Sequence, residues 1–266
     1  MADEEWMVDG PKTIDLAGID HLKVGLIGGQ VDIVGHDEPE ARVEVHSVSG
    51  RDLRIAVQGG RLEIDHPQLR WDNWLDTFRA FRASARADVS VLVPRAVALK
   101  LGVVTASALL SGTRGDASLS TVSGDLVVDA VQGDLQLNSV SGEIAVRDHE
   151  GRVVVHTVSG DVTASGRLTA FSSDGVSADV FLDLTGSGGA VAVNSVSGSV
   201  TARLEGDLPV DYSVSTASGK LQLDGDRATV VRGRYLGSSG PAEGERLDFK
   251  ANTVSGDVNV LHRVPA

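Results

Sequence analysis

Glycine recurs at a constant interval of nine residues in the middle of this chain, from Gly115 to Gly160. The lines that begin at these glycines read GDASLSTVS, GDLVVDAVQ, GDLQLNSVS, GEIAVRDHE and GRVVVHTVS. A short, constant interval is typical of repeat proteins, in which each unit buries its apolar side chains against its neighbours rather than within itself. The sequence therefore predicts a stack of short repeats.

A longer motif, Thr/Ser-Val-Ser-Gly followed by Asp or Glu, marks every second line in this region. Copies of the motif or of close variants end at Gly50, Gly124, Gly142, Gly160, Gly198, Gly219 and Gly256. The repeating unit is therefore about 18 residues long and consists of two unequal halves of about nine residues.

Apolar and polar residues alternate around each motif glycine, which is the period of a β-strand. Val122, Gly124, Leu126 and Val128 share one parity, and we expect all four to face the interior, with the glycine in mid-strand. Asparagine tolerates the left-handed backbone of a sharp corner. We expect such corners four residues before three of the motif glycines, at Asn138, Asn194 and Asn252.

These strands predict an all-β fold, a parallel β-solenoid (β-helix) whose coils of about 18 residues comprise two halves of about nine. An antiparallel meander would show the same alternation. Its two-residue turns should read Asn-Gly or Asp-Gly, which the repeated corners do not, so the solenoid is favoured. We expect a flexible N-terminus at residues 1–11, a single solenoid domain over 12–262 and a tail at 263–266.

Residues 66–87 break the strand pattern. Trp71, Trp74, Phe78 and Phe81 recur there at helical spacing, with arginines around them. We expect a short amphipathic helix over about 68–86, inserted in the solenoid or capping it. Two interpretations stay open: the aromatic side chains seal the core, or they contact a membrane or a partner while the arginines meet lipid phosphates.

The repeated TVSGD, SVSGE and SVSGS, each followed by alternating Val or Leu, resemble the bacterial putative-adhesin family, also called the toastrack domain. The resemblance covers about residues 12–262. It implies a β-solenoid linked to cell-envelope sensing, surface attachment or assembly scaffolding. It implies no catalytic residues, because the family has no agreed ones.

The net charge of −13 repels nucleic acid and anionic lipid. Cysteine is absent, which excludes disulfides and thiolate metal sites. The N-terminal MADEEWMVDG lacks the apolar core of a secretory signal, and no apolar run reaches the length of a membrane-spanning helix. These features predict a cytoplasmic location, with peripheral membrane contact as the alternative.

A column of carboxylates is the main candidate for chemistry. Asp125, Glu143 and Asp161 follow the motif glycine and are expected to point outward from successive coils, about 4.8 Å apart. Such a column could hold Ca²⁺, but the Gly-Gly-x-Gly-x-Asp signature of calcium-binding nonapeptide repeats is absent. A solvated acidic face is the favoured interpretation, and no cofactor is expected.

The sequence therefore predicts a non-catalytic structural or interaction protein that binds a protein, an envelope component or a second copy of itself. One alternative is a membrane-stress sensor that contacts lipid through the aromatic helix. A second is a polysaccharide-active β-helix enzyme. That reading needs one isolated acidic pair, whereas the carboxylate position repeats uniformly.

Overall fold

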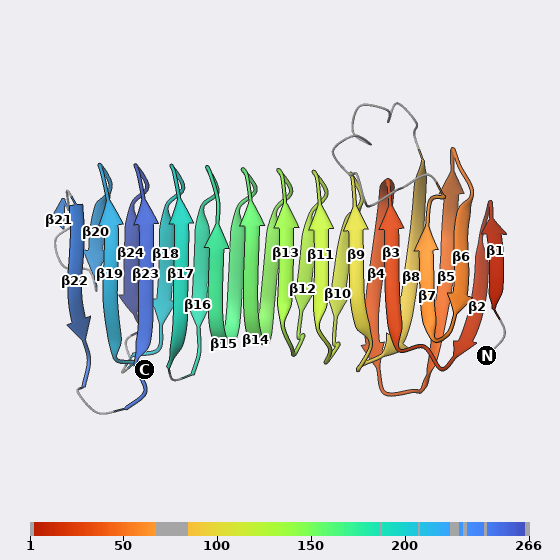
Figure 1. Ribbon diagram of the computed structural model, residues 1–266, viewed down its shortest axis with the longest axis horizontal. Helices are drawn as coiled ribbons and strands as arrows, with labels where there is room; N and C mark the ends of the chain where they lie inside the picture. Colours follow the sequence, from red (N-terminus) through yellow and green to blue (C-terminus); the bar gives the residue numbers. More distant parts are fainter. Residues whose placement is uncertain are drawn as a thin grey trace. The chain divides into compact units, whose positions relative to one another are not determined.

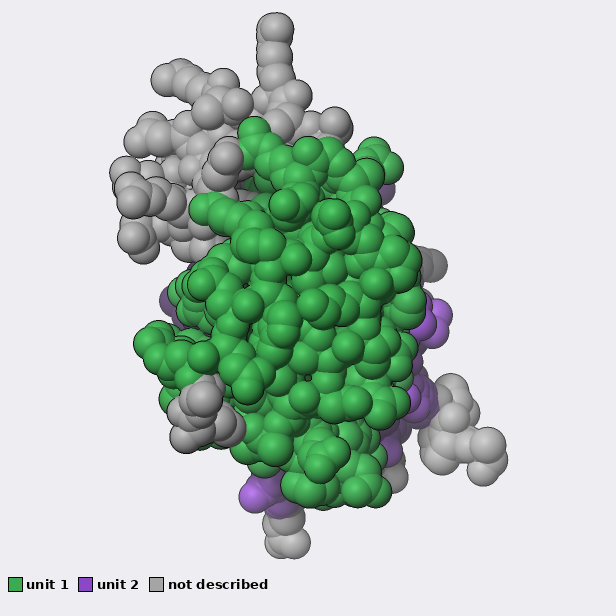
Figure 2. All heavy atoms as spheres, turned by 90° about the vertical axis from the view of Figure 1, so that its right-hand side faces the viewer, with its two compact units in different colours: residues 1–133 green, residues 134–266 purple. Residues whose placement is uncertain are grey.

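The computed structural model describes residues 3–67, 85–186, 188–206, 208–223, 229–230, 233–241 and 244–263. The chain divides into two compact units, residues 1–133 and 134–266, coloured green and purple in Figure 2. The single domain expected over 12–262 stays a prediction. The expected helix over 68–86 and its four aromatic residues lie outside the described residues, apart from the last two positions of that range.

Unit 1 contains twelve labelled strands in its described residues (Figure 1). They are β1 (Glu4–Val8), β2 (Lys12–Ala17), β3 (His21–Leu26), β4 (Gly28–His36), β5 (Glu40–Ser49), β6 (Leu53–Gln58), β7 (Arg61–Asp65), β8 (Arg86–Pro94), β9 (Ala98–Val103), β10 (Ser107–Ser111), β11 (Ala117–Thr121) and β12 (Leu126–Asp129).

The strands of unit 1 pair in two rows. In one row β12, β10, β4 and β8 are parallel, and β5 and β2 continue the row antiparallel. In the other row β11, β9, β3 and β7 are parallel, and β6 and β1 continue it antiparallel. Residues 4–8, which we expected within a flexible N-terminus, instead form the antiparallel strand β1.

Unit 2 contains the remaining labelled strands, β13 to β24 (Figure 1). They are β13 (Leu135–Ser139), β14 (Ile144–Thr157), β15 (Val162–Asp174), β16 (Val180–Leu184), β17 (Gly189–Ser195), β18 (Val200–Leu204), β19 (Val210–Thr216), β20 (Lys220–Leu223), β21 (Thr229–Val230), β22 (Gly233–Ser239), β23 (Leu247–Thr253) and β24 (Val258–His262).

Unit 2 also has two rows, and they confirm the parallel solenoid. The first row runs from β13 through β14, β15, β17, β23 and β19 in parallel, with β22 antiparallel at its end. The second row runs through β14, β15, β16, β18, β24 and β20 in parallel, with β21 antiparallel at its end. The last coil in the sequence, β23 and β24, therefore lies between two earlier coils.

The register confirms the coil length and most of the predicted core. Leu135 lies opposite Val153, an offset of 18 residues, while Phe171 lies opposite Val191, an offset of 20. The apolar residues that follow the motif glycines are buried: they include Leu126, Val128, Ile144, Val146, Val162, Ala164, Val200, Val258 and Val260. These side chains fill the interior between the two rows.

Two details of the predicted coil are wrong. The motif glycine does not lie in mid-strand but in the corner between two strands, and the valine two residues before it turns outward at several corners. The asparagines are strand residues, and the positive φ angles of non-glycine residues are at Ala130 (51°) and Asp148 (47°). The strand parity therefore reverses within the motif, between the buried residue three before the glycine and the buried glycine, and not at the asparagine position.

Candidate functional site

Each motif corner of unit 2 is closed by a buried hydroxyl. The Ser195 hydroxyl accepts the N–H of Gly198 at 2.9 Å, and the Thr157 hydroxyl accepts the N–H of Gly160 at 3.2 Å. This local bond satisfies a backbone donor that the corner removes from the strand ladder. The first residue of the motif therefore faces inward because its hydroxyl is used in the turn.

The third motif residue ties each corner to the preceding coil. The backbone N–H of Ser159 donates to the carbonyl oxygen of Val140 at 3.0 Å, and the Ser159 hydroxyl donates to the same oxygen at 3.2 Å. Equivalent hydroxyl bonds to the valine carbonyl of the preceding corner in the stack recur at Ser177, Ser197, Ser218 and Ser255. Successive corners are thereby held in register.

The glycine of the motif allows close contact between coils. A Cβ atom built on Gly198 would overlap the carbonyl oxygen of Ala178, and one on Gly256 would overlap that of Gly198. The motif glycine is therefore explained by packing of the backbone against the next coil, without a ligand.

The carboxylate column has a structural role in the part of unit 2 that is described. The Asp161 carboxylate accepts the backbone N–H of Asp179 at 3.0 Å, and Asp179 accepts the N–H of Ser199 at 2.7 Å. Asp257 likewise accepts the N–H of Lys220 at 2.8 Å. The bonds to backbone N–H groups, together with the breaks in the column at Ser199 and Lys220, offset the repulsion expected between like charges.

The predicted metal candidates occupy these corners without converging. Glu143 and Asp161 lie in unit 2, one coil apart, while Asp125 lies in unit 1. Among the described residues there is no group of three His, Asp or Glu side chains that could hold a metal ion. Calcium binding by these three residues therefore has no geometric support in the described part of the chain.

The valine at the second position of these corners is the residue that they leave exposed, and Val176 holds the same position in a corner that reads Gly-Val-Ser-Ala at residues 175–178. Val158, Val176, Val196 and Val254 have relative exposures of 47%, 48%, 48% and 52%. Backbone bonds place them in consecutive coils, since Ser177, Val196 and Val254 each donate an N–H to the valine carbonyl of the preceding corner. We call these four residues the valine ridge. They are four of the six large apolar side chains that are exposed among the described residues.

A polar column borders the valine ridge on the side of the first row. Asn252 donates through Nδ2 to Oδ1 of Asn194 at 2.9 Å, and Asn194 donates to Oδ1 of Asp174 at 2.8 Å. His156 lies next in register, with its Nδ1 3.5 Å from Oδ2 of Asp174. An open groove of about 340 Å³ lies here, lined by Asp174, Gly175, Asn194, Ser195, Val196, Asn252, Thr253 and Val254.

The sequence reasoning placed the motif valines in the core and so missed this surface. One available signal was the Thr or Ser three residues before each glycine, because such hydroxyls commonly bond to nearby backbone in turns. A residue whose hydroxyl bonds inside the turn faces inward, and its neighbour must then face outward.

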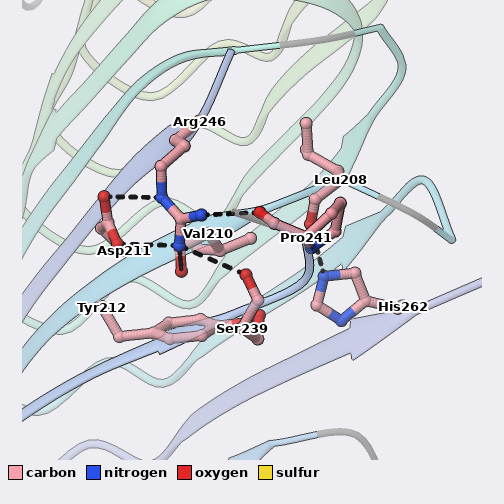
Figure 3. Close-up of polar contacts among 8 residues, drawn as sticks. All are labelled: Leu208, Val210, Asp211, Tyr212, Ser239, Pro241, Arg246 and His262. Carbon is pink, nitrogen blue, oxygen red and sulfur yellow. Dashed lines mark hydrogen bonds and ion pairs between the residues drawn. The ribbon is translucent and has the colours of Figure 1, made fainter. Parts of the chain in front are cut away.

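A second polar cluster secures the coil formed by β19 and β20 (Figure 3). Arg246 forms a bidentate ion pair with Asp211, in which Nε and Nη2 each donate to a carboxylate oxygen at 2.9 Å. This pairing raises the pKa of Arg246. Its guanidinium also donates to the carbonyl oxygens of Val210, Ser239 and Pro241. These contacts join β19 to the residues that precede β23, so the cluster is a structural clamp.

Buried histidine is a further feature that the sequence did not reveal. His66 in unit 1 is 1% exposed, and its Nδ1 accepts the N–H of Ile27 at 3.4 Å. Burial lowers the pKa of His66, and the positive charge of Arg51 lowers it further. The neutral imidazole is therefore the form that the fold favours.

A family model described as Toastrack DUF4097 matches residues 19–261. No curated protein matches the sequence. Among solved structures, a putative lipid binding protein from Parabacteroides distasonis has a TM-score of 0.53 and 14% identity, covering 95% of this chain and 97% of that one.

Two further structures are similar with lower scores. A putative adhesin from Bacteroides fragilis has a TM-score of 0.39 and 8% identity, with 94% of this chain and 96% of that one covered. A putative adhesin from Parabacteroides merdae has a TM-score of 0.37 and 15% identity, with 95% of each chain covered. Within its described residues, the present chain has no helix long and apolar enough to cross a membrane.

Proposed function

This chain belongs to the Toastrack DUF4097 family, and we propose that it is a non-catalytic interaction scaffold whose valine ridge binds another protein or an envelope component. The observation that carries this proposal is the exposure of Val158, Val176, Val196 and Val254 in consecutive coils. Contiguous apolar side chains on a surface are typical of binding sites, whereas scattered ones are not.

The other motif positions support the same interpretation. The hydroxyl of the first motif residue closes the turn, and the serine at the third position bonds to the preceding coil. The glycine lets the backbones of neighbouring coils approach closely, and the carboxylate that follows it accepts a backbone N–H. The corner therefore uses every motif side chain except that of the valine. An outward valine contributes little to the buried core, so a binding role accounts for its recurrence better than stability does.

The alternative structural role of the valines is stacking on one another along the ridge. Neighbouring side chains about 4.8 Å apart bury part of their surface against each other. The exposures of 47–52% show how much of each side chain remains available after this stacking. The valines can both stack on one another and bind a partner. A substitution that keeps the shape of the side chain but adds a polar group distinguishes the two roles, because it preserves stacking and weakens apolar binding.

A variant with Val158, Val176, Val196 and Val254 changed to Thr tests the proposal, because Thr keeps the branched shape and adds a hydroxyl. We expect the immobilised wild-type protein to retain a discrete partner from native lysate and the variant to lose it, with unchanged circular dichroism. A matched variant with Ile at the same positions should retain the partner. Equal retention by the wild-type and Thr proteins would contradict the proposal.

Self-association is one form of this proposal, and it has a separate measurement. Sedimentation velocity over a range of concentrations should show larger species for the wild-type protein and not for the Thr variant if a second copy is the partner. If the wild-type protein is a monomer at every concentration, the partner of the valine ridge is a different protein or an envelope component.

A further inference from the structure

We propose that the partner of the valine ridge is a cationic amphipathic α-helix that lies along the stacking direction of the coils. This inference rests on the proposed function and names the chemistry of the partner. It follows from three properties of the same surface: the spacing of the valines, the charge of the columns beside them and the rigidity of the corners.

The spacing of the valine ridge distinguishes a helix from a strand. From Val158 to Val254 there are three coil intervals, which span about 14 Å at the usual separation of neighbouring strands. Three steps along a helix seam, each from one apolar position to the next about 3.5 residues away, advance about 16 Å. Three i to i+2 steps of an extended strand advance about 20 Å. Only the helix keeps its side chains within about 2 Å of the valines over this length.

The charge beside the valine ridge selects a cationic partner. The column that follows the motif glycines contains Glu143, Asp161, Asp179, Ser199, Asp257 and Lys220. It therefore holds four carboxylates against one ammonium, and Asp174 adds another carboxylate in the column on the opposite side.

Two of the cations of unit 2 are paired with carboxylates. Lys250 lies 2.6 Å from the Asp248 carboxylate, and Arg263 contacts Asp183. Lysine or arginine residues along one flank of a helix would face the carboxylate column while its apolar stripe covered the valines. The same charge opposes nucleic acid and anionic lipid.

The corners present a rigid surface to such a helix. Each serine next to a ridge valine bonds through both N–H and hydroxyl to one carbonyl oxygen of the preceding coil, as Ser197 does with Val176 at 2.9 and 3.4 Å. Hydrogen bonds between side chains likewise fix the polar column, from Asn252 to Asn194 and from Asn194 to Asp174. A surface that is already ordered loses little conformational entropy on binding.

Three labelled peptides of about 18 residues, or about five helical turns, test the inference by fluorescence anisotropy. The first carries Leu at helix-seam spacing with flanking Lys. The second has the same composition with Leu at every second position, and the third has the helix pattern with Glu in place of Lys. We expect the first to bind the wild-type protein at least about tenfold more tightly than the other two.

Protein variants identify the surface that the first peptide uses. The four-valine Thr variant should bind it at least about tenfold more weakly, and the Ile variant should bind it as the wild-type protein does. D161N combined with D179N should weaken binding severalfold and reduce its dependence on ionic strength between about 0.01 and 0.15 M.

The outcomes separate the two proposals. If the strand-patterned peptide binds as well as the helix-patterned one, or if neither binds while a ridge-dependent lysate partner is retained, the helical partner is overturned and the scaffold function stands. If the Thr variant binds both the peptide and the lysate partner as the wild-type protein does, both proposals are overturned.

Discussion

The tetrapeptide Ser-Val-Ser-Gly occurs at residues 195–198 of unit 2 and at residues 47–50 of unit 1, and its structure differs between the two places. In unit 2 it is a coil corner, in which Ser195 accepts the N–H of Gly198 and Val196 points into solvent. The strands on either side, β17 and β18, pair in parallel with the neighbouring coils.

In unit 1 the same four letters end a long antiparallel strand. Residues 47–50 close β5, which pairs antiparallel with both β2 and β8 and carries a bulge between Val45 and Ser47. The Ser47 hydroxyl donates to the Asp88 carboxylate at 2.7 Å instead of closing a turn, and Gly50 has a φ of 83°.

The difference shows that the motif describes a corner only where a parallel coil lies beside it. Gly198 packs on the carbonyl of Ala178, and Ser199, which follows it, donates to Asp179 of the same neighbouring coil. Arg51 follows Gly50, so the acidic acceptor that forms the carboxylate column is missing there. The contacts between coils, more than the local sequence, decide which structure the tetrapeptide adopts.

The largest effect is expected from removing the core beneath the unit 2 corner. Phe249 in β23 is fully buried and meets the ring of Tyr212 edge-on, with centroids 6.2 Å apart. Phe249→Ala should lower the free energy of unfolding by about 3–5 kcal/mol, measured by urea denaturation. Hydrogen exchange should rise at residues 195–198, because β23 pairs with β17. Unchanged protection there would show that the corner forms without its neighbour.

The two glycines provide a direct comparison of the tetrapeptides. Gly198→Ala forces a Cβ into the carbonyl of Ala178 and should cost about 1–3 kcal/mol or more. Gly50→Ala places a side chain at positive φ and should cost about 1 kcal/mol. Gly10→Ala is the control, since nothing lies within 4 Å of its added Cβ. A larger loss at Gly50 than at Gly198 would reverse the comparison.

The parallel coils could be predicted from the sequence, but the strand order could not. The 18-residue interval fixes which residues of successive coils lie opposite one another, and the register confirms it. The copies of the motif at Gly256 and Gly160 both read TVSGD, so nothing in the motif indicates that β23 and β24 lie between earlier coils. Identical repeats therefore predict that the coils stack, but they do not specify the order of the coils in the stack.

One antiparallel pair of unit 1, β6 and β7, has a clear signal in the sequence. Gly59 and Gly60 have φ angles of 55° and 83° and join β6 to β7 in a two-residue hairpin, with Gln58 opposite Arg61. Two glycines between alternating strands are a standard hairpin sequence. Hairpin turns are excluded at the repeated corners, where the coils are parallel, but not in this segment.

Replacing the first residue of each tetrapeptide gives a smaller contrast. Ser195→Ala leaves the buried N–H of Gly198 without its acceptor, which should cost about 1–3 kcal/mol. Ser47→Ala removes an exposed bond to Asp88 and should change stability by no more than about 0.5 kcal/mol. Thermal denaturation of the two variants side by side measures the contrast. Equal losses would show that the hydroxyl has the same role in both places.

The smallest effect concerns pH and is specific to unit 1, where His66 is buried beside Ile27. Because the fold lowers the pKa of His66 below 6.5, the unfolded chain binds more protons than the folded one as pH falls through about 6.5. The contribution of His66 to the free energy of unfolding therefore decreases as pH falls from 8 to about 5.5. Asp65, whose pKa is raised from 3.8 by burial, has the opposite sign, because its folded form binds more protons than the unfolded chain. Urea denaturation of the wild-type protein and of His66→Gln at pH 8 and at about pH 5.5 isolates the contribution of His66, because glutamine can accept the same N–H without titrating. We expect the wild-type protein to lose stability relative to the variant as pH falls, and a constant difference between the two would show that His66 has the same pKa in the folded and unfolded states.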